Sequence, residues 1–210
     1  MTQTATGRSR PYAPRMAPSD RREQLLDAAL QIIVRDGIHK VSIDTVAREA
    51  RVTRPVVYGV FADTNALLRA SLDREERAIL AQLAQIVPTP GEGRPADAAL
   101  AFLDGFLRAV LAAPDRWRAV FALVDSTTPA YRKRVERGRQ MLIGVFEQLV
   151  RWAAADGLDP RTDVEMLARA LYALVWDAGR TVLAEPKDFP PDRVLAFARA
   201  TLARFLPVSS

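Results

Sequence analysis

Apolar residues recur at helical spacing along most of the chain, from residue 19 almost to its end. Prolines and glycines stand where one such stretch ends and the next begins, as they do at the ends of helices. No run of alternating residues bounded by hairpin turns has the length of a strand. The sequence therefore predicts an all-α protein of about nine helices.

Three of these helices are expected before residue 63. Ser19 or Asp20 is a suitable cap for the first, and Gly37 follows its last apolar residue. Ser42 is expected to open a short second helix, and Thr53 a short third helix.

A longer fourth helix is expected from Asp63 or Thr64 to about Val87, before the Pro- and Gly-rich residues 88–95. Five further helices are expected over residues 96–112, 114–125, 129–155, 161–184 and 191–206.

The formal net charge of +5 is concentrated at the N-terminus. Residues 1–22 contain five arginines and one aspartate, which give them a net charge of +4 and leave +1 for the rest of the chain. A basic end on a nearly neutral body suggests a polyanion partner, although a solubilising disordered tail would have the same composition. We divide the chain into a flexible basic arm over residues 1–18, a helical head over 19–66 and a larger helical body over 67–210.

The head has the pattern of a helix-turn-helix, because two short helices joined by a tight turn follow a longer helix. In that motif the second short helix lies in the major groove, with a capped N-terminus towards phosphate and basic residues in its first turn. Thr53 and Arg54 meet both requirements, and Arg54 can pair with guanine for ~1–3 kcal/mol of base discrimination. Val56 can touch a thymine methyl group, and Tyr58 a phosphate. Double-stranded DNA is therefore the predicted partner of residues 19–66.

Gly59 allows two interpretations, because a glycine inside a helix costs roughly 1 kcal/mol relative to alanine. In the first, this face approaches DNA too closely for a side chain. In the second, the short helix already ends at Tyr58.

The head resembles the DNA-binding domain of the TetR family over residues 21–70, almost without gaps. The segments that carry the resemblance are Leu25-Leu26-Asp27-Ala28-Ala29, Asp36-Gly37, Val41 to Ala50, Val52 to Phe61, and Leu67-Leu68. The resemblance implies a homodimeric transcriptional regulator, most often a repressor, whose two heads read a palindromic operator. It also implies a small-molecule effector that binds in the body and controls the distance between the heads.

Three residues depart from the family pattern. Arg51 stands where the turn usually has glycine, and a positive φ there would cost ~1–2 kcal/mol. Val60 and Thr64 replace a usual histidine and a usual lysine that would contact phosphate. We hypothesise that the arm compensates by reaching a minor groove. The predicted DNA-binding residues are Arg8, Arg10, Arg15, Ser42, Arg51, Thr53, Arg54, Pro55, Val56, Tyr58, Gly59 and Thr64.

For the body, the resemblance implies a four-helix dimer interface formed by residues 161–184 and 191–206 of each protomer. Small residues at positions 168, 178 and 179 would allow close helix approach there. The aromatic residues of the body predict a pocket for an apolar or aromatic ligand, a cationic one included, with ordinary core as the alternative for any single ring. The predicted pocket residues are Phe102, Phe106, Trp117, Phe121, Asp125, Met141, Phe146, Tyr172, Trp176 and Arg180.

Other classes of protein are poorly supported. The chain has no cysteine and one histidine, and it has no phosphate-binding loop, nucleophile elbow or HExxH motif, so we expect no metal, no cofactor and no enzyme. Without a long apolar segment or a signal peptide, we expect no membrane association and a cytoplasmic location. The alternative function is a helical binding module that acts through protein contacts or non-specific DNA binding.

Overall fold

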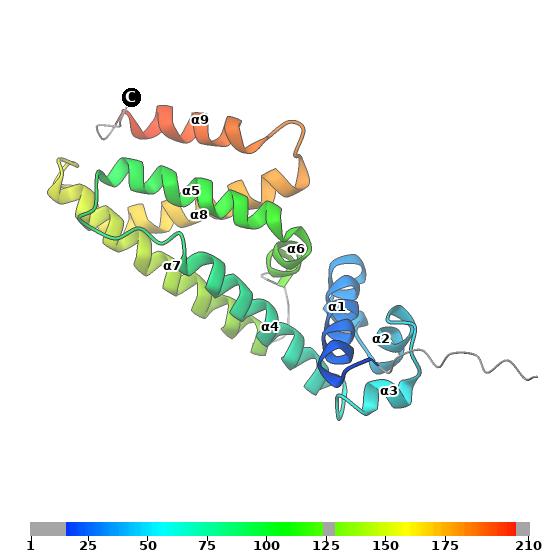
Figure 1. Cartoon of the computed structure of the whole chain (residues 1–210). Helices are drawn as coiled ribbons and strands as arrows, with labels where there is room; N and C mark the ends of the chain where they lie inside the picture. Colours follow the sequence, from blue (N-terminus) through cyan, green and yellow to red (C-terminus); the bar gives the residue numbers. More distant parts are fainter. Residues whose placement is uncertain (1–15, 124–128, 205–210) are drawn as a thin grey trace, which may run out of the picture.

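The computed structural model describes residues 16–123 and 129–204, and every regular element in these two ranges is helical. The expected all-α fold is confirmed (Figure 1). The elements are α1 (Pro18–Asp36), the 3-10 turn η1 (Ile38–Lys40), α2 (Ile43–Glu49), α3 (Arg54–Tyr58), α4 (Thr64–Ala84), α5 (Pro95–Ala112), α6 (Pro114–Leu123), α7 (Pro129–Ala155), α8 (Val164–Ala184) and α9 (Pro191–Leu202).

Several helix ends differ from the sequence prediction. Helix α1 begins at Pro18 with Ala17 as its N-cap, so Ser19 and Asp20 lie inside the helix rather than capping it. A proline suits this first position because its missing N–H would have no partner there. Helix α4 stops at Ala84 instead of about Val87. Helix α8 starts only at Val164, and α9 ends at Leu202 instead of residue 206.

Other predicted caps are confirmed. The Ser42 hydroxyl accepts a bond from the Thr45 amide, and the Thr45 side chain accepts one from the Ser42 amide, which completes a capping box at the start of α2. The Asp63 carboxylate accepts a bond of 2.6 Å from the Ala66 amide at the start of α4. Both caps fix where the chain turns into a helix of the head.

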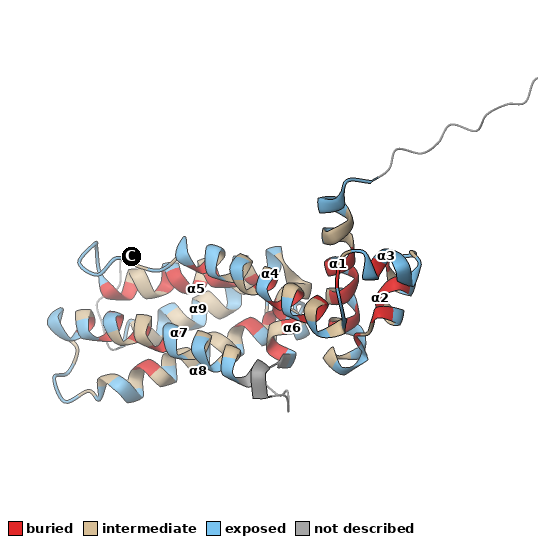
Figure 2. Ribbon diagram, turned by 90° about the horizontal axis from the view of Figure 1, so that it is seen from below, coloured by how far each residue is buried: buried red, intermediate tan, exposed pale blue. Residues whose placement is uncertain are grey.

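The head and the body have separate apolar cores (Figure 2). The head core is formed by α1, α2, α3 and the first turn of α4, with Leu25, Val46 and Val57 completely buried. The body core is formed mainly by α5, α6, α7 and α8 around Phe102 and Trp117. In Figure 1, α3 lies at the outer edge of the head, and the described end of α9 lies at the end of the body remote from it.

Helices α4 and α6 connect the two parts. Leu67 and Leu68 of α4 pack in the head core, whereas Leu83 of the same helix packs in the body core. From α6, Ala119 packs in the head core and Trp117 in the body core. Because two helices belong to both cores, a movement of the head must be accompanied by a movement of α4 or α6. The division at residues 66 and 67 stays a prediction.

The small residues of α8 pack inside their own protomer. Ala168 and Gly179 are buried, and a Cβ at Gly179 would lie 2.7 Å from the Phe106 ring. This differs from the expectation that they promote close approach between subunits. The absence of a side chain at Gly179 instead lets α8 pack tightly on the aromatic residues of α5 and α6.

Candidate nucleic-acid interface and ligand cavity

The predicted recognition helix α3 is anchored by one side chain and exposes the others. Val57 is completely buried in the head core, which fixes the rotation of α3 about its axis. Arg54, Pro55, Val56 and Tyr58 are exposed on the remaining surface, with Tyr58 57% exposed. Val56 and Tyr58 therefore lie on the outer surface of the head, where the sequence predicts contact with DNA.

Arg54 and Asp44 form an ion pair between α3 and α2, and both side chains remain largely exposed. A guanidinium held in this way is already extended along the outer surface of the head. To contact a guanine, Arg54 would have to leave the carboxylate of Asp44. The loss of this ion pair would cost little stability, because both of its side chains are exposed.

Arg51 adopts the left-handed conformation that the sequence identified as costly there. Its φ is 55°, and it is the only non-glycine residue with a positive φ in the described ranges. The Val52 amide donates to the Ala47 carbonyl at 2.9 Å, and the Arg51 amide donates to the Arg48 carbonyl at 3.1 Å. These two bonds are those of a Schellman motif, whose residue after the C-cap must be left-handed. The strain is therefore accepted at Arg51, and its exposed side chain places a positive charge beside the start of α3.

The other predicted DNA-binding residues occupy several environments. Thr53 is the N-cap of α3, yet in the described part of the chain its side chain accepts no bond from the helix. Pro55 has no N–H to donate, and the Val56 amide donates to the Thr53 carbonyl at 3.0 Å instead. Thr64 is half-buried at the start of α4. Arg8, Arg10 and Arg15 lie outside the described residues.

Gly59 is the C-cap of α3, with φ −67°, so the interpretation that the helix ends at Tyr58 is correct. A Cβ at Gly59 would meet only the Pro55 and Val56 carbonyl oxygens at 3.4 Å, an ordinary contact. Neither the backbone conformation nor the packing of the head requires glycine at this position. Close approach to DNA stays a prediction for this residue.

A cavity lies where the head meets the body and encloses about 900 Å³ of space, part of which is open to solvent. Its wall includes Leu30 and Ile33 of α1, so the head itself contributes to it. The rest of the described wall comes from α4, α6, α7 and α8. Four predicted pocket residues line it, namely Trp117, Met141, Tyr172 and Trp176.

Four other predicted pocket residues belong to the body core. Phe102 packs edge-on against Phe146 at 5.3 Å between ring centroids, and Phe106 packs edge-on against Trp117 at 5.1 Å. Phe121, also buried, makes the same kind of contact with Trp176 at 4.8 Å. All four phenylalanines are buried in the body core and lie outside the described cavity wall, so ordinary core is the interpretation that fits them.

The two polar residues predicted for the pocket are not found in its wall. Arg180 is exposed on the surface of α8, outside the described cavity wall, and Asp125 lies outside the described residues.

Glu75 is a buried carboxylate in the cavity wall that the sequence analysis missed. It is 5% exposed and accepts bonds of 2.7 Å from both Arg74 and Arg116. Leu68, Leu72, Glu75 and Ile79 are separated by four, three and four residues, so this carboxylate lies on the apolar face of α4. That spacing was the signal available in the sequence.

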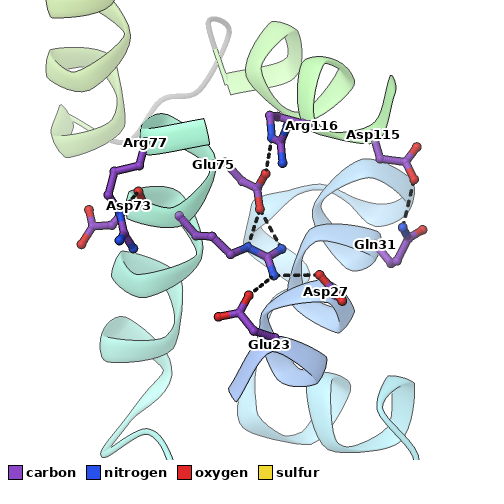
Figure 3. Close-up of polar contacts among 9 residues, drawn as sticks. Glu23, Asp27, Gln31, Asp73, Glu75, Arg77, Asp115 and Arg116 are labelled. Carbon is purple, nitrogen blue, oxygen red and sulfur yellow. Dashed lines mark hydrogen bonds and ion pairs between the residues drawn. The ribbon is translucent and has the colours of Figure 1, made fainter. Parts of the chain in front are cut away.

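The Glu75 network extends into the head (Figure 3). Arg74 also contacts Glu23 at 3.0 Å and Asp27 at 2.7 Å, both on α1. Burial works against the charge of Arg74, but its hydrogen bonds to these three carboxylates outweigh it and raise the pKa of the guanidinium. A continuous set of ion pairs thus joins α1 of the head to α6 of the body through one turn of α4.

The part of the cavity wall that α7 and α8 form combines aromatic and basic groups. The Arg139 guanidinium lies 5.7 Å from the centroid of the Tyr172 ring, and the Tyr172 ring stacks on Trp176. Burial raises the pKa of the Tyr172 phenol, so its hydroxyl stays protonated at neutral pH.

Neither a metal centre nor a membrane span is found in the part of the chain that the structure describes. Its acidic, histidine and cysteine residues form no group of three that could hold a metal ion. None of its helices is long and apolar enough to cross a membrane.

The family model of bacterial regulatory proteins of the tetR family matches residues 25–71, which include α2, the turn at Arg51 and α3. Residues 25–71 therefore form a DNA-binding domain of the TetR family. Regulators of the TetR family are DNA-binding proteins and not enzymes, in agreement with the expectation from the sequence.

Known relatives match either part of the chain or most of it. The nicotine-responsive transcriptional repressor HdnoR of Paenarthrobacter nicotinovorans is 34% identical over 79 residues, which is 38% of this chain and only 39% of that protein. The transcriptional regulator BetI of Escherichia coli K12 is 26% identical over 196 residues, 90% of this chain and 95% of that protein. A TetR-like transcriptional regulator from Rhodococcus sp. RHA1 has the same fold, with a TM-score of 0.71 at 24% identity over 90% of this chain and 99% of that one.

Proposed function

We propose that the chain is a ligand-responsive transcriptional repressor that binds a palindromic operator as a homodimer and is released by a small apolar or aromatic effector. The observation that carries this proposal is the composition of the cavity wall, in which Leu30 and Ile33 of the head face residues of α4, α6, α7 and α8. A molecule in this cavity would contact both parts of the protein at once. Its affinity would therefore depend on where the head lies relative to the body.

Linkage then gives the direction of the response. An effector that prefers the conformer with misplaced heads weakens operator binding by the ratio of its affinities for the two conformers. Glu75 is joined by ion pairs to α6 and, through Arg74, to α1. Because Glu75 and Arg116 line the cavity, an occupant would disturb these pairs directly. The nicotine-responsive relative is a repressor, which favours release over activation.

The dimer is supported by exposed apolar side chains on α8 and α9. Met166 and Leu174 of α8 are 62% and 63% exposed, and Phe197 of α9 is 69% exposed. Val194, Leu195 and Ala198 of α9 pack against the body core, but no described residue of the helix is fully buried in its own protomer. Two such helices from each protomer could form a four-helix interface that hides these side chains.

DNA footprinting on the region upstream of the chain's own gene tests operator binding. A specific footprint with steep salt dependence is the expected result. Protection that ignores sequence would instead support the alternative of a non-specific helical binding module. Deleting residues 2–15 should lower both the affinity and the salt dependence if the basic arm contacts DNA, whereas unchanged values would exclude a role for the arm.

Three variants locate the contact surface. Arg54→Ala should weaken specific binding by about ten-fold or more, the usual loss for a guanine contact. Gly59→Ala should also weaken binding while leaving the free energy of unfolding equal or higher, because the head has room for the added methyl group. Arg77→Ala, which removes an exposed arginine from α4, should leave operator affinity unchanged and serves as the control.

A further inference from the structure

We propose that the effector is an apolar molecule that carries a hydrogen-bond acceptor, such as a carbonyl oxygen, and no positive charge. This inference rests on the proposed function, since it specifies what the cavity between head and body binds. It comes from two buried polar atoms of residues that line the cavity, the Oγ of Ser71 and the Nε1 of Trp117.

Both atoms are buried and lack a hydrogen-bond partner among the described residues. Ser71 is completely buried, and Trp117 is 1% exposed. A buried polar group without a partner costs free energy, so such groups in a binding cavity indicate the polarity of the ligand. The indole N–H can only donate, and its complement must therefore be an acceptor. The Ser71 hydroxyl can donate to the same acceptor or accept from a hydroxyl beside it.

The charges of the wall argue against a cation. Its two carboxylates are already paired, Glu75 with Arg74 and Arg116, and Glu76 with Arg134. The wall also holds a third arginine, Arg139, which lies beside Tyr172. A cationic ligand would lose its hydration without gaining a free carboxylate, and it would approach three guanidinium groups. The ligand class is therefore narrower than the one predicted from the sequence, because that prediction also allowed cationic ligands.

A set of three isosteric probes tests this assignment by calorimetry on the full-length protein. Para-acetylbiphenyl carries a carbonyl, para-ethylbiphenyl replaces it with a methylene group, and the corresponding biphenylethylammonium ion carries a positive charge. Acetophenone, ethylbenzene and phenylethylammonium repeat the comparison at half the size. We expect the ketone to bind at least ten-fold more tightly than the hydrocarbon, and the ammonium ion no more tightly than the hydrocarbon.

Two variants test whether the preference for the ketone over the hydrocarbon comes from the Oγ of Ser71 and the Nε1 of Trp117. Ser71→Ala and Trp117→Phe should each reduce the ratio of ketone affinity to hydrocarbon affinity by at least three-fold. Without ligand, Ser71→Ala should also raise the unfolding temperature, since it removes an unpartnered hydroxyl from a buried site. Trp152→Phe is the control for the loss of an indole, because Trp152 packs in the body core outside the described cavity wall and should leave the ratio unchanged.

The outcomes separate this inference from the proposed function. Equal affinity for ketone and hydrocarbon, tighter binding of the ammonium ion, or a preference that both variants retain would overturn the inference and leave the cavity as an effector site. If no probe of either size bound while the operator was still bound, the effector site itself would be in the wrong place. In that case the proposed release mechanism would fail as well.

Discussion

At the scale of single residues, Arg51 combines a strained backbone conformation with a positive charge for which the sequence predicts a role in DNA binding. The two hydrogen bonds that end α2 require a left-handed residue at this position, and its φ is 55°. Glycine would adopt this conformation without the steric cost of ~1–2 kcal/mol that a side chain brings. Arginine at this position has that steric cost, and it places a positive charge next to the predicted recognition helix α3. Stability and DNA affinity should therefore respond separately to substitution here.

The pair Arg51→Gly and Arg51→Ala separates the two effects, because both remove the charge and only glycine removes the strain. Arg51→Gly should be more stable than Arg51→Ala by about 1 kcal/mol in urea unfolding, after allowing for the greater freedom of glycine in the unfolded chain. Both variants should bind the operator more weakly than the parent, with a salt slope lower by about one. Equal unfolding free energies for the two variants would show that the turn relaxes and holds no strain.

At the scale of helices, the sequence predicted the order of the elements well because the signals are local. Ser42 and Asp63 cap their helices as expected, and the Pro- and Gly-rich residues 88–95 separate α4 from α5. Helix ends moved where a stronger local signal competed, as at Pro18, which starts α1 before the predicted caps.

The cavity was predicted less completely, because its wall depends on contacts between distant segments. The aromatic residues of the body could be found by composition, but their packing decides which ones face the cavity. Trp117 lines it, whereas Phe106 packs against Trp117 in the core. Glu75 meets Arg116, 41 residues away, and no periodic pattern identifies such a partner. Only the placement of Glu75 on an apolar helix face could have indicated its burial.

Helix α4 yields a prediction about the buried ion pairs. Glu75→Gln keeps the size of the side chain but leaves two guanidinium groups without their buried carboxylate, so it should lower the free energy of unfolding by about 3 kcal/mol. The control is Glu76→Gln, one residue along the same helix. Glu76 is more exposed, and its partner Arg134 also contacts Asp73 at 2.7 Å, so the expected loss is below about 1 kcal/mol. Urea unfolding measures the free energy of unfolding of both variants. Similar losses would show that the buried Glu75 network stabilises the protein no more than the exposed Glu76 pair does.

At the scale of the whole molecule, the head and the body have different roles in the proposed function. If the protein reads a palindrome as a dimer, each head must present α3 at a fixed distance from the other, and a single chain does not set that distance. The cavity lies at one end of the body beside α1, while α9 packs on α5 along the body. If α8 and α9 hold two protomers together, they form the fixed frame against which the cavity can move α4 and the head. Repression and release would then depend on exposed residues of α8 and α9 that lie neither in the head nor in the cavity wall.

Disrupting that interface should therefore abolish operator binding in a protein that is still folded. Leu174→Glu and Phe197→Glu each place a charge on an exposed apolar position of α8 or α9, where it cannot be buried against a second protomer without a large desolvation cost. We expect each variant to sediment as a monomer, to keep its helical circular dichroism, and to lose operator affinity by at least 100-fold, since a single head contacts only half of a palindrome. Leu111→Glu, a similar change at an exposed leucine of α5, should remain dimeric and bind normally. A dimeric Leu174→Glu variant with full affinity would place the interface elsewhere, and the frame for the heads would have to be sought on another surface of the body.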